Sequence, residues 1–133
     1  MIPLKTFYHV AQSHFSPEWC DKVIDSIEKS NDYETHERYT SFRSSEVIFF
    51  QNDDSTEWIY EPCYDLLDDV KAKYWRTFKL GNLNRLQYTI YNSPGGKYNW
   101  HTDTGQPRTG MNARLLTVAI QLTDSSDYSG GEF

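Results

Sequence analysis

The sequence predicts an α+β fold in which helices dominate the N-terminal half and strands follow. Three observations support this prediction. Two apolar stripes before residue 76 have the 3.6-residue period of an amphipathic helix. From Leu83 onward, apolar and polar residues alternate with the two-residue period of a strand. The length of 133 residues is enough for one hydrophobic core, so residues 1–133 are expected to form a single domain.

The first predicted elements are a short strand over residues 6–10 and a helix after it. The helix is expected to begin at Ser16, because serine can cap the free amide groups of a first turn. Pro17 suits the first helical position and Glu18 adds an acid to the first turn. Apolar side chains then fall on one face, which predicts that this helix covers a core: Trp19, Val23, Ile24 and Ile27.

A second strand and a second helix follow. The apolar run 46–50 predicts the strand, and the polar residues 52–55 end it and can cap the next element. A helix from about residue 56 to residue 75 is predicted by a second apolar stripe of helical period, which consists of Cys63, Tyr64, Leu67, Val70 and Tyr74.

Two further strands are predicted in the C-terminal half, over residues 86–91 and 115–122. Arg114 precedes the second of these and either orients a loop, contacts a substrate or is an ordinary surface cation. The apolar positions that alternate along the two predicted strands, and so share a face within each, are Leu86, Tyr88, Ile90, Leu116, Val118, Ile120 and Leu122. Both strands can therefore place one face on a core and the other toward a cavity, where Thr117 and Gln121 would share a side.

The segment between these strands contains the motif that bears most directly on function. A turn with Gly95 and Gly96 leads into His101 and Asp103, which would share a face if the chain there is a strand. An imidazole and a carboxylate are two members of the facial triad that binds non-haem Fe(II). We therefore predict that His101 and Asp103 are metal ligands. The alternative is a hydrogen-bonded or ion-paired couple beside a turn.

The order of these features resembles the core of the Fe(II)/2-oxoglutarate-dependent dioxygenases of the prolyl 4-hydroxylase type, including the PKHD-type hydroxylases. The shared pattern is a strand with a tyrosine, a glycine-rich turn, His-x-Asp, an Arg-led apolar strand and a Gly-Gly-Glu segment. The resemblance is strong over residues 83–133 and looser over the N-terminal half. It implies a double-stranded β-helix (jelly-roll, cupin-like) core, with the N-terminal helices packed on one sheet.

The resemblance also implies an activity and its cofactors. These are Fe(II), 2-oxoglutarate as cosubstrate and, as an optional addition, ascorbate. Tyr91 matches the family's tyrosine that contacts the cosubstrate, and Thr117 is a second candidate for that role. The implied reaction hydroxylates a C–H bond with O₂, and in the resembling enzymes the substrate is commonly a peptidyl proline. The metal and the keto acid would supply the oxidation, so no side chain is predicted to act as nucleophile or general base.

The family's second metal-binding histidine and its Arg or Lys for the far carboxylate of 2-oxoglutarate have no counterpart after Asp103. We therefore expect the 133-residue chain to be an inactive fragment that lacks its C-terminal strands. Two other interpretations stay open. One is a non-catalytic jelly-roll binding module, and the other is a His-x-Asp metalloprotein that uses a different metal. His9, His14 and His36 match no ligand position of the family.

Composition narrows the list of partners. A formal net charge of −6 disfavours nucleic acid and anionic membrane surfaces, so the expected partners are small molecules and a peptide or protein substrate. No apolar run is long enough for a transmembrane helix, and the N-terminus lacks the features of a signal peptide. Cys20 and Cys63 lack the spacing of a zinc or redox site and are expected to be reduced thiols. A cytoplasmic location is expected.

Overall fold

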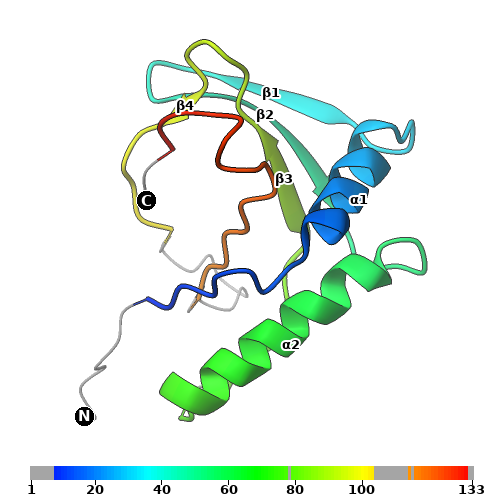
Figure 1. Ribbon diagram of the computed structural model, residues 1–133, viewed down its shortest axis with the longest axis vertical. Helices are drawn as coiled ribbons and strands as arrows, with labels where there is room; N and C mark the ends of the chain where they lie inside the picture. Colours follow the sequence, from blue (N-terminus) through cyan, green and yellow to red (C-terminus); the bar gives the residue numbers. More distant parts are fainter. Residues whose placement is uncertain (1–7, 78, 104–113, 115, 132–133) are drawn as a thin grey trace, which may run out of the picture.

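The computed structural model describes residues 8–77, 79–103, 114 and 116–131 of the chain. Two helices and an antiparallel sheet of four strands make up its regular structure (Figure 1). The predicted mixture of helices and strands in one α+β architecture is thereby confirmed. The sheet is open, however, and a closed jelly-roll is not present among the described residues.

Helix α1 spans Pro17–Glu28 and begins as predicted. The Ser16 hydroxyl accepts a hydrogen bond from the Trp19 amide at 3.2 Å, which satisfies one of the free N–H groups of the first turn. Val23 and Ile27 are buried, one turn apart on the same face. That face packs on the sheet.

Helix α2 spans Glu57–Tyr74, close to the predicted range. Its start is organised by Asp53, whose carbonyl accepts the amides of Thr56 and Glu57 at 3.0 and 2.8 Å. Burial is greatest in the first two turns, at Ile59, Tyr60 and Cys63. The rest of the predicted stripe is only half-buried, so this helix contacts the core mainly through its N-terminal part.

The sheet is built around β2, which spans Arg43–Phe50 and therefore starts three residues before the predicted strand. β1, Thr35–Tyr39, pairs with one edge of β2 and was not predicted. β3, Leu86–Ile90, pairs with the other edge and confirms a predicted strand. The short β4, Lys97–Tyr98, pairs with that same edge of β2 further along.

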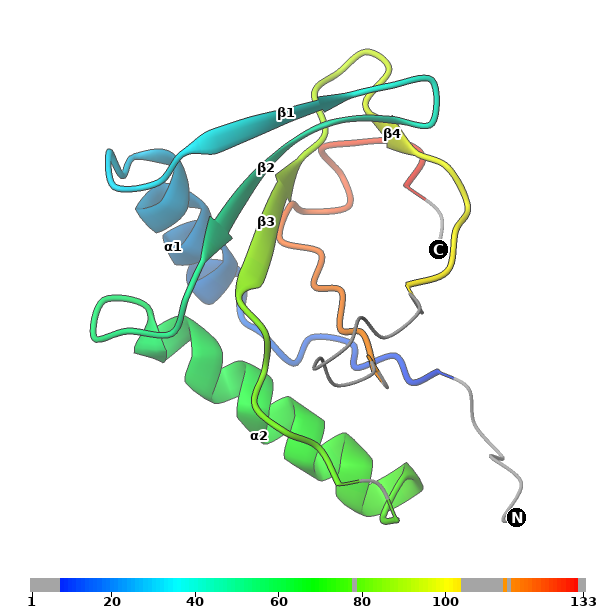
Figure 2. The same cartoon turned by 180° about the vertical axis from the view of Figure 1, so that it is seen from behind.

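The two faces of β2 have different neighbours because side chains alternate along a strand. Ile48 and Phe50 point toward the helices and form the core with Val23, Ile27, Ile59 and Tyr60. Tyr88 on β3 lies on this side too, and its hydroxyl donates to Glu28 Oε1 of α1 at 2.7 Å. Both helices therefore contribute to one core, and Figures 1 and 2 show α1 against the sheet and α2 across the end at which β2 finishes. Arg43, Ser45 and Val47 occupy the opposite face.

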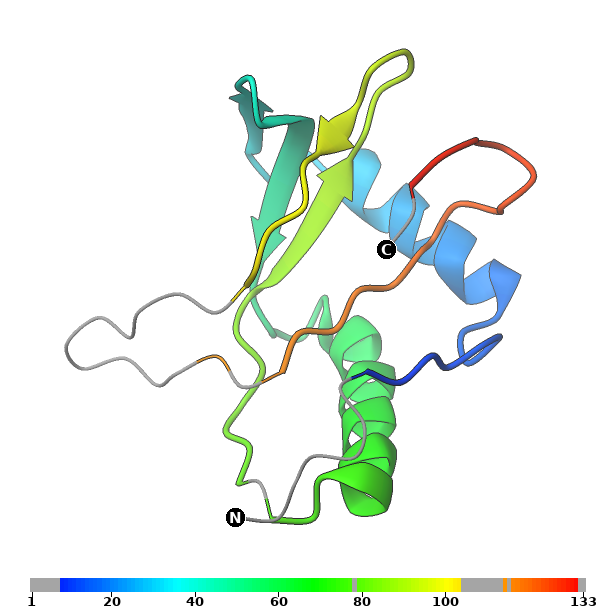
Figure 3. The ribbon, with the colours of Figure 1, turned by 90° about the vertical axis from the view of Figure 1, so that its left-hand side faces the viewer.

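Residues 116–131 form no strand, so the prediction of a strand over residues 115–122 is wrong for its described part. Figure 3 shows the first part of this segment as an extended trace on the β3 side of the sheet, after which the chain turns at residues 124–127. Leu116, Ile120 and Leu122 of the predicted apolar face are half-buried, and Leu122 packs against the core. Val118 of that face is 39% exposed, and the residues of the other face are exposed: Thr117, Ala119 and Gln121. The alternation thus still separates a more buried face from an exposed one, but the backbone pairs with no strand of the described residues.

Two further expectations concern the chain as a whole. The predicted strand over residues 6–10 is wrong where it can be judged, because residues 8–10 have no regular structure, and residues 6 and 7 lie outside the described part. Neither α1 nor α2 is long and apolar enough to span a membrane, and these are the helices of the described residues.

Candidate functional site

The segment that carries His101 leaves the sheet just before it reaches the predicted ligands. The Asn99 amide donates to the Phe42 carbonyl at 3.0 Å, one step beyond the β4 pairing. Residues 101–103 have no strand structure, so the predicted strand face for His101 and Asp103 is wrong. The local backbone nevertheless brings the two side chains together, with His101 Nε2 3.3 Å from Asp103 Oδ1.

Both ring nitrogens of His101 face oxygen atoms. The Nδ1 atom lies 2.8 Å from the Asn99 carbonyl, and Nε2 faces the Asp103 carboxylate. A neutral imidazole has only one N–H. Both contacts are therefore favourable if each nitrogen carries a proton, or if Nδ1 carries the proton and a cation binds Nε2. A backbone carbonyl on Nδ1 is also the usual device that orients a metal-binding histidine.

The distance between the two atoms is compatible with a shared metal ion. Ligand atoms about 2.1 Å from one metal and at right angles to each other are about 3 Å apart. The His101 and Asp103 side chains are 30% and 37% exposed, so the pair is reachable from solvent. Among the described residues, no third His, Cys, Asp or Glu lies close enough to complete a group of three.

Aromatic rings hold the imidazole in place. The Tyr98 ring stacks on His101, with 3.8 Å between ring centroids and 23° between planes. Phe42, in the turn between β1 and β2, meets both rings edge-on. Since Tyr98 is paired to Arg43 in the sheet, the position of His101 depends on β2 through this stack.

A glycine turn precedes this cluster, and each of its two glycines has a backbone role. Gly95 adopts a φ of +93°, in the region that favours glycine. A Cβ atom on Gly96 would lie 2.8 Å from the Asn92 carbonyl oxygen, which is too close. The Gly96 amide donates to that same oxygen at 2.9 Å, so the close approach is part of the turn.

Arg114 is placed against the candidate site. Its Nη1 atom lies 3.7 Å from Asp103 Oδ1, the oxygen that also faces His101. Of the roles considered from sequence, this contact fits one in which Arg114 orients the loop that ends at Asp103. Arg114 also neutralises the charge of the Asp103 carboxylate and would compete with a metal ion for Oδ1.

The predicted cosubstrate residues differ in their surroundings. Tyr91 follows β3 and is 49% exposed. Burial raises the pKa of Tyr91, the nearby Arg43 guanidinium lowers it, and Tyr98 raises it, so Tyr91 belongs to the same cluster. Thr117 is exposed on the segment 116–131, and no hydrogen bond among the described residues links it to His101 or Asp103. The structure therefore does not bring Thr117 to the pair.

Arg43 is the member of the cluster that sequence reasoning missed. Its guanidinium lies over the Tyr98 ring, with Cζ 4.4 Å from the ring centroid. The available signal was its position in the sequence. Arg43 lies three residues before Glu46, and because side chains alternate along a strand, the two point to opposite faces. Arg43 is therefore on the face away from the helices. Only the register of β4 against β2 shows that this face carries Tyr98.

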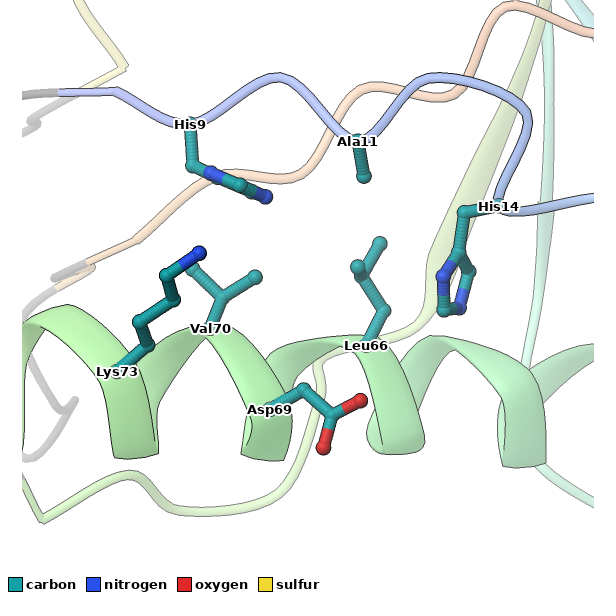
Figure 4. Close-up of a pocket in the computed structure, with 7 residues that line it drawn as sticks. All are labelled: His9, Ala11, His14, Leu66, Asp69, Val70 and Lys73. Atoms are coloured by element: carbon teal, nitrogen blue, oxygen red, sulfur yellow. The ribbon is translucent and has the colours of Figure 1, made fainter.

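Two hollows in the surface of the described residues are lined by other side chains. One, of about 290 Å³, lies between residues 9–14 and α2, with His9 and His14 above Leu66 and Val70 (Figure 4). Another, of about 360 Å³, is lined by polar residues near the end of β2 together with Tyr60 and Leu83. Neither of these two hollows is lined by His101 or Asp103.

Comparison of the chain with protein-family models, with curated proteins and with solved structures gave no match.

Proposed function

We propose that this chain carries part of the iron site of an Fe(II)- and 2-oxoglutarate-dependent dioxygenase. The observation that supports the proposal best is the pairing of His101 Nε2 with Asp103 Oδ1 at 3.3 Å, while the Asn99 carbonyl holds Nδ1. This is the arrangement in which an imidazole is oriented for a metal and a carboxylate stands beside it.

The residues present fit two of the three protein ligands of the facial triad. His101 and Asp103 would hold the metal, which when bound supplies the oxidation of a C–H bond by O₂ and the keto acid. The surrounding side chains have supporting roles in this proposal. Tyr98 keeps the imidazole in its plane, and the Asn99 carbonyl fixes the nitrogen that carries the proton.

The proposal extends to the fold and to the chain itself. The extended part of residues 116–122, with Leu122 on the core, is compatible with a jelly-roll in which it pairs with a further strand. With two protein ligands among the described residues, this chain alone is proposed to bind iron weakly and to be inactive. Ascorbate remains an optional cofactor.

Exposed rings around the pair suit a peptide substrate, in keeping with the proposed peptidyl proline. Trp100 is 79% exposed, Tyr91 49%, Phe42 44% and Tyr98 39%. Aromatic surfaces of this kind bind proline-rich segments by packing against the pyrrolidine ring. The cosubstrate would contact Tyr91, and Thr117 would have to approach the pair by a movement of its segment.

The proposal is tested by anaerobic addition of Fe(II) and 2-oxoglutarate, which should give a visible charge-transfer band at sufficiently high concentration. The band should disappear in the double variant His101→Ala, Asp103→Ala. A matched control exists at the start of β1, where His36 Nδ1 lies 4.0 Å from Oε1 of the preceding Glu34, and the variant Glu34→Ala, His36→Ala should retain the band. Retention in the first variant would refute the site.

One observation favours a second function. The ion pair of Arg114 with Asp103 gives the carboxylate a partner without any metal, and the exposed aromatic rings can bind a peptide on their own. A non-catalytic binding module is therefore the alternative. It predicts peptide binding that is unaffected by Fe(II) and by the His101→Ala substitution.

A further inference from the structure

The hollow between residues 9–14 and α2 has an apolar floor. Leu66 and Val70, one turn apart on α2, are half-buried and point toward the overlying segment, and Ala11 faces them from that segment (Figure 4). The hollow has a volume of about 290 Å³, close to the lower limit for small-molecule sites. Since a water molecule occupies about 30 Å³ in the liquid, a ligand of roughly ten non-hydrogen atoms fits.

One end of this hollow carries a positive charge. The Lys73 ammonium lies 5.1 Å from the centre of the Tyr74 ring, and the centre of the His9 ring lies 5.2 Å from it. Tyr74 thus brings an ammonium and an imidazole to one place, and Figure 4 shows both groups directed into the hollow. An ammonium has three N–H donors, and an imidazole can supply another.

Lys73 does not use the acidic partner that its own helix offers. Asp69 precedes it by four residues, a spacing at which an acid and a base commonly pair on a helix. The two residues form no ion pair within the described part of the chain. In Figure 4 the Asp69 carboxylate lies beside the helix, while the Lys73 side chain extends toward the overlying segment. The ammonium is therefore available to an anion in the hollow.

We infer that this hollow binds a small monocarboxylate with an apolar body. The carboxylate contacts Lys73 and His9, and the apolar body covers Leu66 and Val70. Covering that floor removes apolar surface from water, and the ammonium favours an anion over a neutral molecule. Asp69 also lines the hollow and opposes a second negative charge, so a monoanion is preferred to a phosphate ester, which carries about −1.5 to −2 charges.

The test is a nuclear magnetic resonance titration of the metal-free protein with 3-phenylpropanoate, which follows the methyl signals of Leu66 and Val70. The probe should shift these signals to saturation. Acetate has the charge without the apolar body and should bind at least about 10-fold more weakly, since each buried CH₂ group is worth about 4-fold in affinity. The uncharged 3-phenylpropan-1-ol should bind roughly 2- to 5-fold more weakly, as expected for loss of an exposed ion pair.

Two variants test the two ends of the ligand. Lys73→Gln should weaken the binding of 3-phenylpropanoate by roughly 2- to 5-fold and leave that of the alcohol unchanged. Lys71→Gln is the matched control, because Lys71 lies on the same helix but does not line the hollow, and it should bind as the parent does. Val70→Thr replaces a methyl group of the floor with a hydroxyl and should weaken the binding of both compounds by about 4-fold.

Four results overturn the inference. They are the absence of a saturable shift, binding of acetate or the alcohol as tight as that of 3-phenylpropanoate, an unchanged affinity in Lys73→Gln, and an unchanged affinity in Val70→Thr. If Val70→Thr does not fold by circular dichroism, Lys73→Gln decides, because Lys73 is exposed and its replacement leaves the core intact.

A last variant separates this hollow from the proposed iron site. The double variant His101→Ala, Asp103→Ala should bind 3-phenylpropanoate as the parent does, because neither residue lines the hollow. Loss of binding in that variant means that the probe binds at the pair, and this also overturns the inference. Failure of the Fe(II) experiment has no bearing on the hollow, so each proposal is tested by its own result.

Discussion

His101 Nε2 and Asp103 Oδ1 lie 3.3 Å apart, and Asp103 Oδ1 lies 3.7 Å from Arg114 Nη1 as well. One carboxylate oxygen therefore faces an imidazole and a guanidinium at once. In the absence of a metal this is a small ion-paired cluster on the surface. A divalent cation between the imidazole and the carboxylate would have to compete with Arg114 for that oxygen, and the competition can be measured.

We predict that Arg114→Gln strengthens the binding of Mn(II). Removing a partly exposed ion pair frees the carboxylate, and such pairs contribute about 0.2–1 kcal/mol, which corresponds to a gain of roughly 1.4- to 5-fold. Isothermal titration measures the change. Arg76→Gln, at an exposed arginine whose Nε donates to the Ala72 carbonyl, is the control and should have no effect. Weaker binding in Arg114→Gln would mean that the positioning of Asp103 by Arg114 outweighs the competition for its oxygen.

Gly96→Ala is expected to destabilise the protein and displace the His101 cluster. The added methyl group would meet the Asn92 carbonyl oxygen at 2.8 Å and backbone atoms of Tyr91. A clash of this kind typically costs about 1–3 kcal/mol. Urea unfolding measures the loss. Gly81→Ala is the matched control, because no atom lies within 4 Å of its Cβ position, and it should stay within about 0.5 kcal/mol of the parent.

The buried thiol of Cys63 should make stability depend on pH in the alkaline range. Burial raises the pKa of Cys63 to about 11 from 9.0. Between these values the unfolded chain loses the thiol proton while the folded chain keeps it, so stability is present below pH 9 and falls as the pH rises. The loss should be about 2–3 kcal/mol, at about 1.4 kcal/mol for each pH unit between the two pKa values.

Urea unfolding at pH 8 and pH 11 isolates this contribution. The fall in stability between the two should be smaller in Cys63→Ala than in the parent, whatever the substitution costs at pH 8. Cys20→Ala, at a half-buried thiol, should flatten the profile less. An unchanged fall in Cys63→Ala would show that other groups account for the alkaline loss.

Ser16→Ala should lower stability by about 1 kcal/mol through loss of the N-terminal cap of α1. Ser26 in the same helix is the control, since its hydroxyl donates to the Lys22 carbonyl at 2.7 Å and caps nothing. Ser26→Ala should be neutral or slightly stabilising, because alanine is the better helix former. Equal effects of the two substitutions in urea unfolding would contradict the role of Ser16.

The helices were predictable because their signals are local. The cap at Ser16 and the helical period around Val23 and Ile27 lie within the element that they define. β1 was missed for the opposite reason. Its sequence from Thr35 to Tyr39 has one half-buried position and no apolar alternation, so its strand structure comes from pairing with β2. A segment of this kind is recognisable only once its neighbour is known.

The prediction of a strand at residues 115–122 was wrong for a related reason, because a strand depends on its pairing partner. Alternation indicates which side chains face a core, and Leu122 does face it, but a strand also needs a partner for its backbone hydrogen bonds. For the site, the proximity of His101 and Asp103 was anticipated through a strand that the structure does not contain. Arg43 was missed because its relation to His101 passes through the register of two strands.

The shared edge of β2 has a consequence for how this region tolerates change in length. β3 and β4 are successive stretches of one line of pairing, with Ile90 opposite Glu46 and Lys97 opposite Ser44, and residues 91–96 loop out between them. Residues inserted into that loop would enlarge it while Lys97 and Tyr98 keep their partners. A residue inserted between Arg43 and Glu46 would shift one stretch against the other. The pairing of Lys97 and Tyr98 with β2 thus fixes the position of His101, and the length of the loop before Lys97 does not change it.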